Sequence, residues 1–101
     1  MDGFRCAFEA EVWEYDGQGA WHFVSLPEDV TDEIDERFGH RAKGFGSQRV
    51  EVTIGSTMWR TSIFPDTKRG TYILPVKKAV RKAEQLVDGS MASVELEVVQ
   101  E

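Results

Sequence analysis

Apolar and polar residues alternate along most of the chain. Over residues 4–12 every even position is apolar, from Phe4 to Val12, while Arg5, Glu9 and Glu11 occupy odd positions. A period of two is typical of a β-strand that buries one face. The segments expected to form strands are 4–12, 20–26, 49–54, 57–64, 72–74 and 92–98.

Turn-forming residues separate these segments. Asp16-Gly17-Gln18-Gly19 predicts a turn between the first two strands, because glycine adopts positive φ without steric cost. Gly55-Ser56 predicts a two-residue hairpin turn. Residues 65–70 are expected to form a turn or loop, and Pro75 is expected to end the fifth strand because proline has no backbone N–H.

A first helix is predicted after residue 27. Val30, Ile34 and Phe38 recur at a spacing of four, which places them on one helical stripe. Ser25-Leu26-Pro27-Glu28 fits a capping box with proline in the first turn, and Gly39 is the expected terminator. The opposite face is almost wholly acidic, and its simplest interpretation is a solvated helix face.

A second helix is predicted to begin at Pro75 and to end at Asp88-Gly89. Two sets of residues recur on its opposite faces. The expected buried set is Val76, Ala79, Val80, Ala83 and Leu86, and the expected outer set is Lys77, Lys78, Arg81 and Lys82.

These elements define the expected fold. The order is β-β-α-β-β-β-α-β, in a mainly β protein with two α-helices and a single domain over residues 1–101. A small split β-barrel covered by two helices would remove exposed strand edges and bury both helical stripes. We therefore predict that architecture.

Composition indicates the cellular compartment in which the protein is expected. Cys6 is the single cysteine, so no internal disulfide is possible and a reducing compartment is indicated. The chain has neither a signal-like start nor an apolar run near the ~20 residues of a membrane helix. We expect a soluble cytoplasmic protein without a membrane association.

Charge is unevenly distributed along the chain. The net charge is -6, which argues against nucleic acid as the main partner. Six acidic residues fall within residues 28–36, whereas residues 57–86 contain seven of the twelve Lys and Arg residues. These seven are Arg60, Lys68, Arg69, Lys77, Lys78, Arg81 and Lys82. The molecule is therefore expected to be a charge dipole.

Several motifs together resemble the domain of unknown function 1905 family. They are Phe8-Glu9-Ala10, the run 21–27 (WHFVSLP), Gly55 with 59–65 (WRTSIFP), and 70–78 (GTYILPVKK) with Arg81 and Asp88-Gly89. The resemblance covers nearly the whole chain. It implies a split, barrel-like β fold with two helices and a relation to the YdeI/OmpD-associated group, but it transfers no catalytic residues.

The strand over residues 57–64 raises a question that the sequence leaves open. Trp59 and Ile63 lie on one face, and Arg60 and Ser62 lie on the other. If the Trp59 face is buried, Arg60 and Ser62 form either a polar site for an anionic ligand or an ordinary solvent-exposed strand face. The candidate ligand-binding residues are Arg60, Ser62, Phe64, Lys68, Arg69, Tyr72, Lys77 and Arg81.

Catalytic and metal chemistry find little support. The possible metal ligands Cys6, His22 and His40 have no zinc-site spacing. Cys6 fits a small buried residue better than an activated thiolate, and Ser62 has no histidine nearby in sequence. We expect no metal, no cofactor and no catalytic residue.

Three functions are compatible with this pattern. The leading hypothesis is a small binding module for an anionic small molecule or a peptide-like ligand. The second is a nucleic-acid-associated regulator, suggested by fold analogy and the basic helix, and the third is an uncharacterised enzyme. Both a monomer and a dimer are compatible with the predicted barrel.

Overall fold

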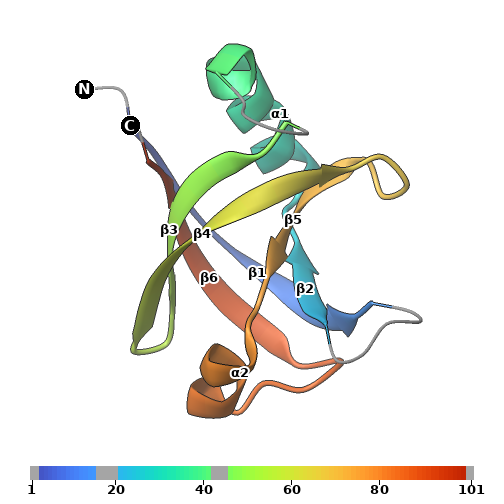
Figure 1. The fold of residues 1–101 in the computed structure, drawn as a ribbon, viewed down its shortest axis with the longest axis vertical. Coiled ribbons are helices and arrows are strands. Elements are labelled where there is room, and N and C mark those ends of the chain that lie inside the picture. The colour runs from blue at the N-terminus through green and yellow to red at the C-terminus, as the bar shows by residue number, and fades with distance from the viewer. Residues whose placement is uncertain (1–2, 16–20, 42–45, 100–101) are drawn as a thin grey trace.

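The computed structural model describes residues 3–15, 21–41 and 46–99 (Figure 1). It confirms the predicted order of elements. They are β1 (Phe4–Glu14), β2 (His22–Ser25), α1 (Glu28–Phe38), a short 3-10 helix (Gly39–Arg41), β3 (Gln48–Ile54), β4 (Thr57–Asp66), β5 (Thr71–Pro75), α2 (Lys78–Glu84) and β6 (Met91–Val98). The predicted turn at residues 16–19 lies outside the described residues.

The six strands form a closed antiparallel barrel in the order β1-β2-β5-β4-β3-β6. Two long strands each belong to two sheets. Residues 4–11 of β1 pair with β6, whereas residues 12–14 pair with β2. Residues 57–63 of β4 pair with β3, whereas residues 64–66 pair with β5. We call β1-β6-β3-β4 the β3 sheet and β1-β2-β5-β4 the β5 sheet, and this division confirms the predicted split barrel.

The barrel interior contains the residues that the alternation places inward. Ile63 and Leu74 are fully buried, and Trp59 is partly buried against the core. Arg60 is exposed on the outer surface. The open question about β4 is thus settled, because the Trp59 face is the inner one.

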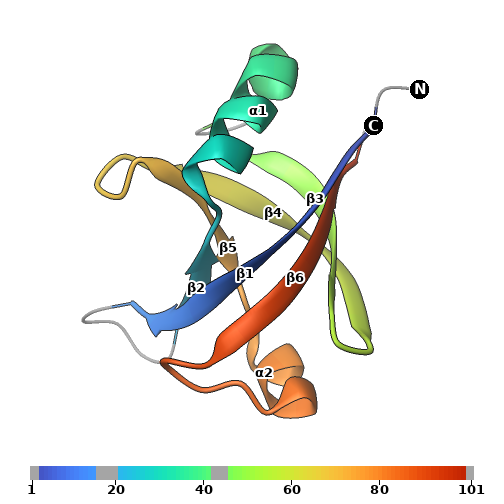
Figure 2. The same ribbon diagram turned by 180° about the vertical axis from the view of Figure 1, so that it is seen from behind.

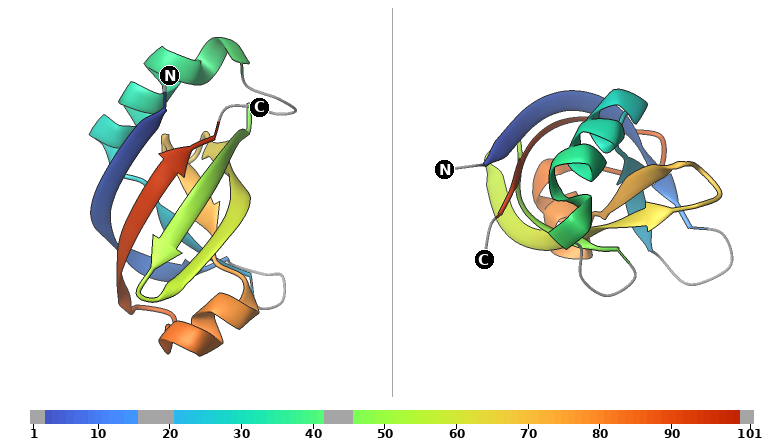
Figure 3. Two further views of the ribbon diagram at one scale, coloured as in Figure 1. Left: turned by 90° about the vertical axis from the view of Figure 1, so that its left-hand side faces the viewer. Right: turned by 90° about the horizontal axis from the view of Figure 1, so that it is seen from above.

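The two helices lie at opposite ends of the barrel (Figures 1 and 2). Seen from above, α1 lies across one end (Figure 3), where Ile34 and Phe38 are buried. Gln48 Nε2 of β3 donates a hydrogen bond of 2.9 Å to the carbonyl oxygen of Phe38. Apolar burial and this buried hydrogen bond together hold the C-terminal end of α1 on the barrel.

At the other end, α2 is attached to the β3–β4 turn. Glu84 Oε2 accepts a hydrogen bond of 2.6 Å from the hydroxyl of Thr57. Gly55 has φ +61, and a Cβ built on it would lie 2.0 Å from Glu84 Oε1. The positive φ favours glycine at this predicted hairpin turn, and a side chain there would also displace the Glu84 carboxylate.

The second helix is shorter than predicted. It ends at Glu84 because Gln85 adopts a left-handed conformation with φ 57 and ψ 47. Val76 and Leu86 are buried outside the helix, whereas Ala79 and Ala83 are exposed. The predicted stripe of five buried residues on one helix was wrong. Within α2 the buried residue is Val80, and Val76 and Leu86 cover the barrel end from the segments on either side of the helix.

The predicted capping box of α1 was also wrong. No side chain caps the helix, and the Ser25 hydroxyl instead accepts a hydrogen bond of 3.0 Å from Trp13 Nε1. The α-helix does end at Phe38, with the predicted terminator Gly39 as its C-cap, although Gly39 is right-handed and begins the short 3-10 helix. Strand β4 continues through Pro65 to Asp66, because Pro65 pairs with Tyr72 of β5.

Within the described residues, the structure contains no helix with the length and apolar character needed to span a bilayer.

The inward assignment of β4 predicts unequal costs for two truncations on the same strand. Ile63→Ala should lower the free energy of unfolding by about 2–5 kcal/mol, because a fully buried side chain is replaced by a cavity. Arg60→Ala should change it by less than about 1 kcal/mol, because Arg60 is exposed and its ion pair with Glu51 is solvated. Urea denaturation of both variants measures the difference. Equal costs would contradict the assignment.

Candidate ligand-binding groove

Arg60, Ser62 and Phe64 lie on the outer face of β4. Arg60 Nε is 3.5 Å from Glu51 Oε2 on the neighbouring strand β3. Ser62 Oγ accepts a hydrogen bond of 3.5 Å from Arg49 Nη1, also on β3. Arg60 and Ser62 are thus engaged with side chains of the adjacent strand, as in an ordinary solvent-exposed sheet face.

Tyr72 does not share that face. Its side chain is 3% exposed and its hydroxyl donates a hydrogen bond of 3.2 Å to Asp35 Oδ1 of α1. Its backbone N–H donates to Thr31 Oγ1 at 3.2 Å. Burial and the Asp35 carboxylate raise the pKa of Tyr72. Tyr72 and Arg60 are both candidate ligand-binding residues, but their side chains do not meet. The register of β5 places Tyr72 inside the barrel, where its hydroxyl is hydrogen-bonded to α1.

Lys68 and Arg69 lie in the β4–β5 turn, which Asp66 organises. Asp66 Oδ1 accepts hydrogen bonds from the backbone N–H of Lys68 at 2.9 Å and of Arg69 at 3.4 Å. Asp66 Oδ2 is 3.1 Å from Arg69 Nη1. Burial tends to raise the pKa of Asp66, but the hydrogen bonds from Arg69 and Lys68 lower it below its usual value. Arg69 is thereby held with its guanidinium 3.6 Å from the centroid of the Trp13 ring.

Lys77 and Arg81 line an open groove of about 380 Å³ at the α2 end of the barrel. The other lining residues are Trp21, His22, Pro75, Val76 and Lys78. Trp21 and Pro75 supply apolar surface, and Lys77 and Lys78 are exposed. Arg81 Nε donates a hydrogen bond of 3.1 Å to the carbonyl oxygen of Val76, so part of the guanidinium is already engaged.

The two lysines of the groove carry uncompensated charge. Considering only residues 3–15, 21–41 and 46–99, no carboxylate forms an ion pair with Lys77 or Lys78. The acidic face of α1 cannot balance them, because α1 lies at the opposite end of the barrel (Figure 1). The groove therefore combines apolar surface with two cations that are available to an incoming anion.

An aromatic cluster continues from the groove along the outer face of the β5 sheet. The ring centroid of Phe23 lies 6.4 Å from that of Trp21, 5.1 Å from that of Trp13 and 6.2 Å from that of Tyr15. We call these four residues the aromatic cluster. The cluster was not predicted from the sequence, although Trp13, Trp21 and Phe23 stand at odd positions, opposite in parity to the buried Val12 and Val24.

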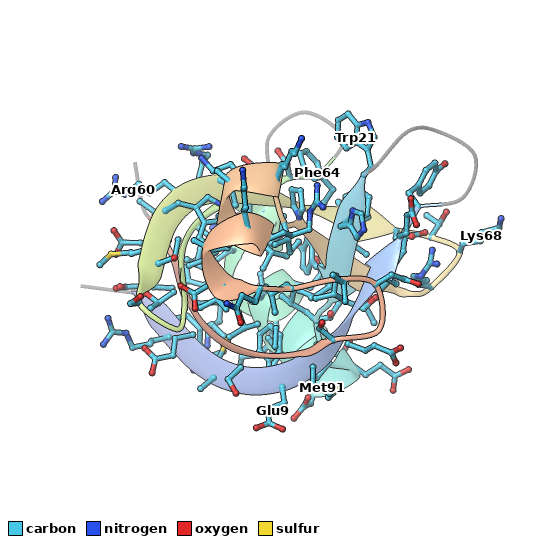
Figure 4. The ribbon with its side chains drawn as sticks, turned by 90° about the horizontal axis from the view of Figure 1, so that it is seen from below. Glu9, Trp21, Arg60, Phe64, Lys68 and Met91 are labelled. Carbon is cyan, nitrogen blue, oxygen red and sulfur yellow. The ribbon has the colours of Figure 1, made fainter. Side chains whose placement is uncertain are left out.

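A second hollow, of about 470 Å³, lies on the outer face of the β3 sheet. Its lining includes the small residues Ala7, Gly55 and Ser93 and two carboxylates, Glu9 and Glu95. Figure 4 shows Glu9 on the opposite side of the barrel from Trp21. The carboxylates would repel an anionic ligand, so this hollow does not suit the predicted ligand class.

Cys6 lies in an environment that disfavours a nucleophile. Burial and, secondarily, the charge of Asp29 raise the pKa of the thiol to about 11. Since the thiolate is the reactive form, Cys6 is largely unreactive at neutral pH. Among the described residues, no three His, Cys, Asp or Glu side chains are grouped so as to hold a metal ion.

The fold defines the class of protein, and one comparison with known proteins defines the family. A six-stranded closed barrel with a helix at each end defines a small mainly β protein of the split-barrel type. The model of the family described as "Domain of unknown function (DUF1905)" matches residues 8–96, and the chain belongs to this family. The search of curated proteins found no match. The relation to the YdeI/OmpD-associated group stays a prediction.

The lowered pKa of Asp66 predicts a pH-dependent contribution to stability. The charged carboxylate stabilises the fold above the usual carboxyl pKa of 3.8, and this contribution is lost as pH falls through the lower folded-state value. Asp66→Asn should therefore be less stable than the unsubstituted protein at pH 7, with a smaller difference near pH 3. Thermal unfolding at both pH values measures this.

Asp66→Ala provides the comparison for that experiment. It also removes the acceptor of two backbone N–H groups, so it should destabilise the protein at both pH values. An Asp66→Asn difference that is the same at pH 7 and pH 3 would contradict the assigned charge effect.

The raised pKa of Cys6 predicts slow alkylation. A rise from 9.0 to about 11 reduces the thiolate fraction near pH 8 by about 100-fold relative to the unfolded chain. Iodoacetamide should therefore label the folded protein far more slowly than the urea-unfolded protein, with a rate that increases about tenfold per pH unit from pH 8 to pH 10. A rate plateau below pH 9 would contradict the raised pKa.

Proposed function

We propose that the protein is a small binding module for organic anions, which it binds in the groove between β2, the end of β5 and α2. The observation that carries the proposal is the combination of Lys77 and Lys78 with the exposed ring of Trp21 in one groove. The site thus corresponds to the C-terminal part of the predicted 57–81 region. Arg60, Ser62 and Tyr72 do not belong to it.

The anionic part of the ligand is bound by the two lysines. An ammonium group forms charge-assisted hydrogen bonds with carboxylate, sulfonate or phosphate oxygens. Lysine acts as a mobile point charge and does not impose the planar bidentate geometry of arginine. The groove therefore selects for negative charge more than for one particular anion.

The apolar part of the ligand contacts Trp21, Pro75 and Val76. Trp21 is 63% exposed, so a planar ring can stack on it without displacing another side chain. A volume of about 380 Å³ falls at the lower end of the range for small-molecule sites. The best match is a small aromatic or planar anion, and an acidic side chain of a peptide fits the same chemistry.

The dye 1-anilinonaphthalene-8-sulfonate tests the proposal, because it combines an aromatic ring with one negative charge. The double variant Lys77→Glu/Lys78→Glu should weaken dye binding tenfold or more, since two attractive charges become repulsive. Trp21→Ala should weaken it as well, because the stacking surface is lost. Fluorescence titration in low salt gives each Kd.

Lys82→Glu is the matched control for that test. Lys82 is exposed on α2 but does not line the groove, so its charge reversal should alter the dye Kd by less than about threefold. Circular dichroism establishes that each variant is folded. Equal dye binding by the double variant and the unsubstituted protein would refute the groove as the site.

A further inference from the structure

We propose that the groove is one end of a longer binding surface for single-stranded nucleic acid. The surface runs over the outer face of the β5 sheet from α2 to the β4–β5 turn. This inference rests on the proposed groove, and it adds the aromatic cluster and the cations of the turn.

Exposed aromatic rings are concentrated on this face. Trp21 and Tyr15 are 63% and 48% exposed, although both contact Phe23. Phe64, which is 39% exposed, pairs with Ile73 of β5, and Ile73 in turn pairs with Ser25 of β2. Figure 4 shows Trp21 and Phe64 on the same side of the barrel.

Such rings are suited to unpaired bases. Every base has a π-face that can stack on an aromatic side chain, so stacking requires little sequence preference. In a duplex the base faces are already stacked on one another, and only a single strand can present them to the protein. The aromatic surface therefore favours a single strand over a duplex.

Cations are located at both ends of β5. Lys77 and Lys78 follow its C-terminal end, and Lys68 and Arg69 precede its N-terminal end. Five residues of β-strand span about 16 Å, so the two basic ends are separated by the length of a few nucleotides. Lysines at the two ends can contact different phosphates of one strand while bases stack between them.

Carboxylates near this face offset part of that positive charge and leave Lys68, Lys77 and Lys78 without an ion pair to a described carboxylate. Asp66 is paired with Arg69, and Arg69 remains over the Trp13 ring, where it adds a cation–π surface. Asp88 Oδ1 accepts the backbone N–H of Glu14 at the end of β1. The other acidic groups lie mainly on the outer face of the β3 sheet and on α1, which adjoins the N-terminal end of β5 through Tyr72.

The combination of exposed rings and cations on this face distinguishes two kinds of polyanionic ligand. An acidic peptide would satisfy the lysines but would leave the exposed rings of Trp21, Tyr15 and Phe64 without a stacking partner. A single-stranded nucleic acid satisfies both features, because it alternates phosphates with planar bases. The chemistry of the face thus favours nucleic acid over an acidic protein.

Fluorescence anisotropy with fluorescein-labelled dT12 tests the inference. Four phosphate contacts predict that affinity falls about 50-fold between 50 and 200 mM salt, from a slope of about -0.7 per contact. Trp21→Ala should weaken binding about fivefold or more at fixed salt, because a stacked base loses its platform. A salt-independent signal or an unchanged Trp21→Ala affinity would overturn the inference.

A matched pair of variants tests the far end of the surface. Lys68→Gln should weaken dT12 binding and reduce the salt slope by about 0.7, while leaving binding of the dye in the groove unchanged. Arg60→Gln removes the same charge from a different side of the barrel (Figure 4) and should have little effect. Equal effects of the two variants on dT12 would overturn the extended surface.

Competitors separate stacking from charge. Unlabelled dT12 should displace the labelled strand more effectively than a 12-base-pair duplex or poly-L-glutamate at equal charge concentration. Equal competition by poly-L-glutamate would overturn the inference in favour of an acidic protein partner. Absence of dT12 binding at 50 mM salt with normal dye binding would overturn this inference alone, whereas loss of both would also remove the proposed groove.

Discussion

The sharing of β1 and β4 between two sheets is the constraint on which the rest of the molecule depends. Each strand changes its partner part-way along its length, β1 at Val12 and β4 at Phe64. This arrangement closes the barrel, and closure fixes one face of every strand as inner and the other as outer. The ends of the barrel then need covering, and α1 and α2 provide it with buried residues such as Ile34 and Val80.

Closure also explains why the aromatic cluster lies outside. Val12 pairs with Val24 in the interior, so the neighbouring pair of Trp13 and Phe23 must face outward. Phe23 is nevertheless only 8% exposed, because its aromatic neighbours cover it. The cluster is therefore packed but external, and Trp21 supplies its most exposed ring. Tight ring packing gives the outer face a fixed shape without enlarging the core.

Local patterns predicted the features that depend on neighbouring residues. The alternation of apolar and polar residues identified the strands and their inner faces, because successive side chains of a strand point to opposite sides. The capping box failed because Trp13, 12 residues before Ser25, uses the same hydroxyl. The candidate residues Arg60 and Tyr72 lie on different faces of the barrel wall, because strand register decides which side chains meet. Trp13 and Phe23 stand at odd positions and Val12 and Val24 at even ones, which indicates that the two aromatic residues lie on the opposite strand face from the valines. Only the closed barrel shows that this face is the outer one.

The net charge of -6 is a weak guide to what this protein binds. The molecule extends 34 Å along its longest axis, and α1 and α2 lie at its two ends (Figure 1). The Debye length at 0.1 M ionic strength is about 10 Å, so much of the field from the acidic helix is screened before it reaches the α2 groove. An approaching anion responds chiefly to Lys77 and Lys78 and to the charges beside them. The α2 end of an acidic protein can therefore be locally basic, because the barrel keeps Lys77 and Lys78 away from the acidic helix (Figure 1).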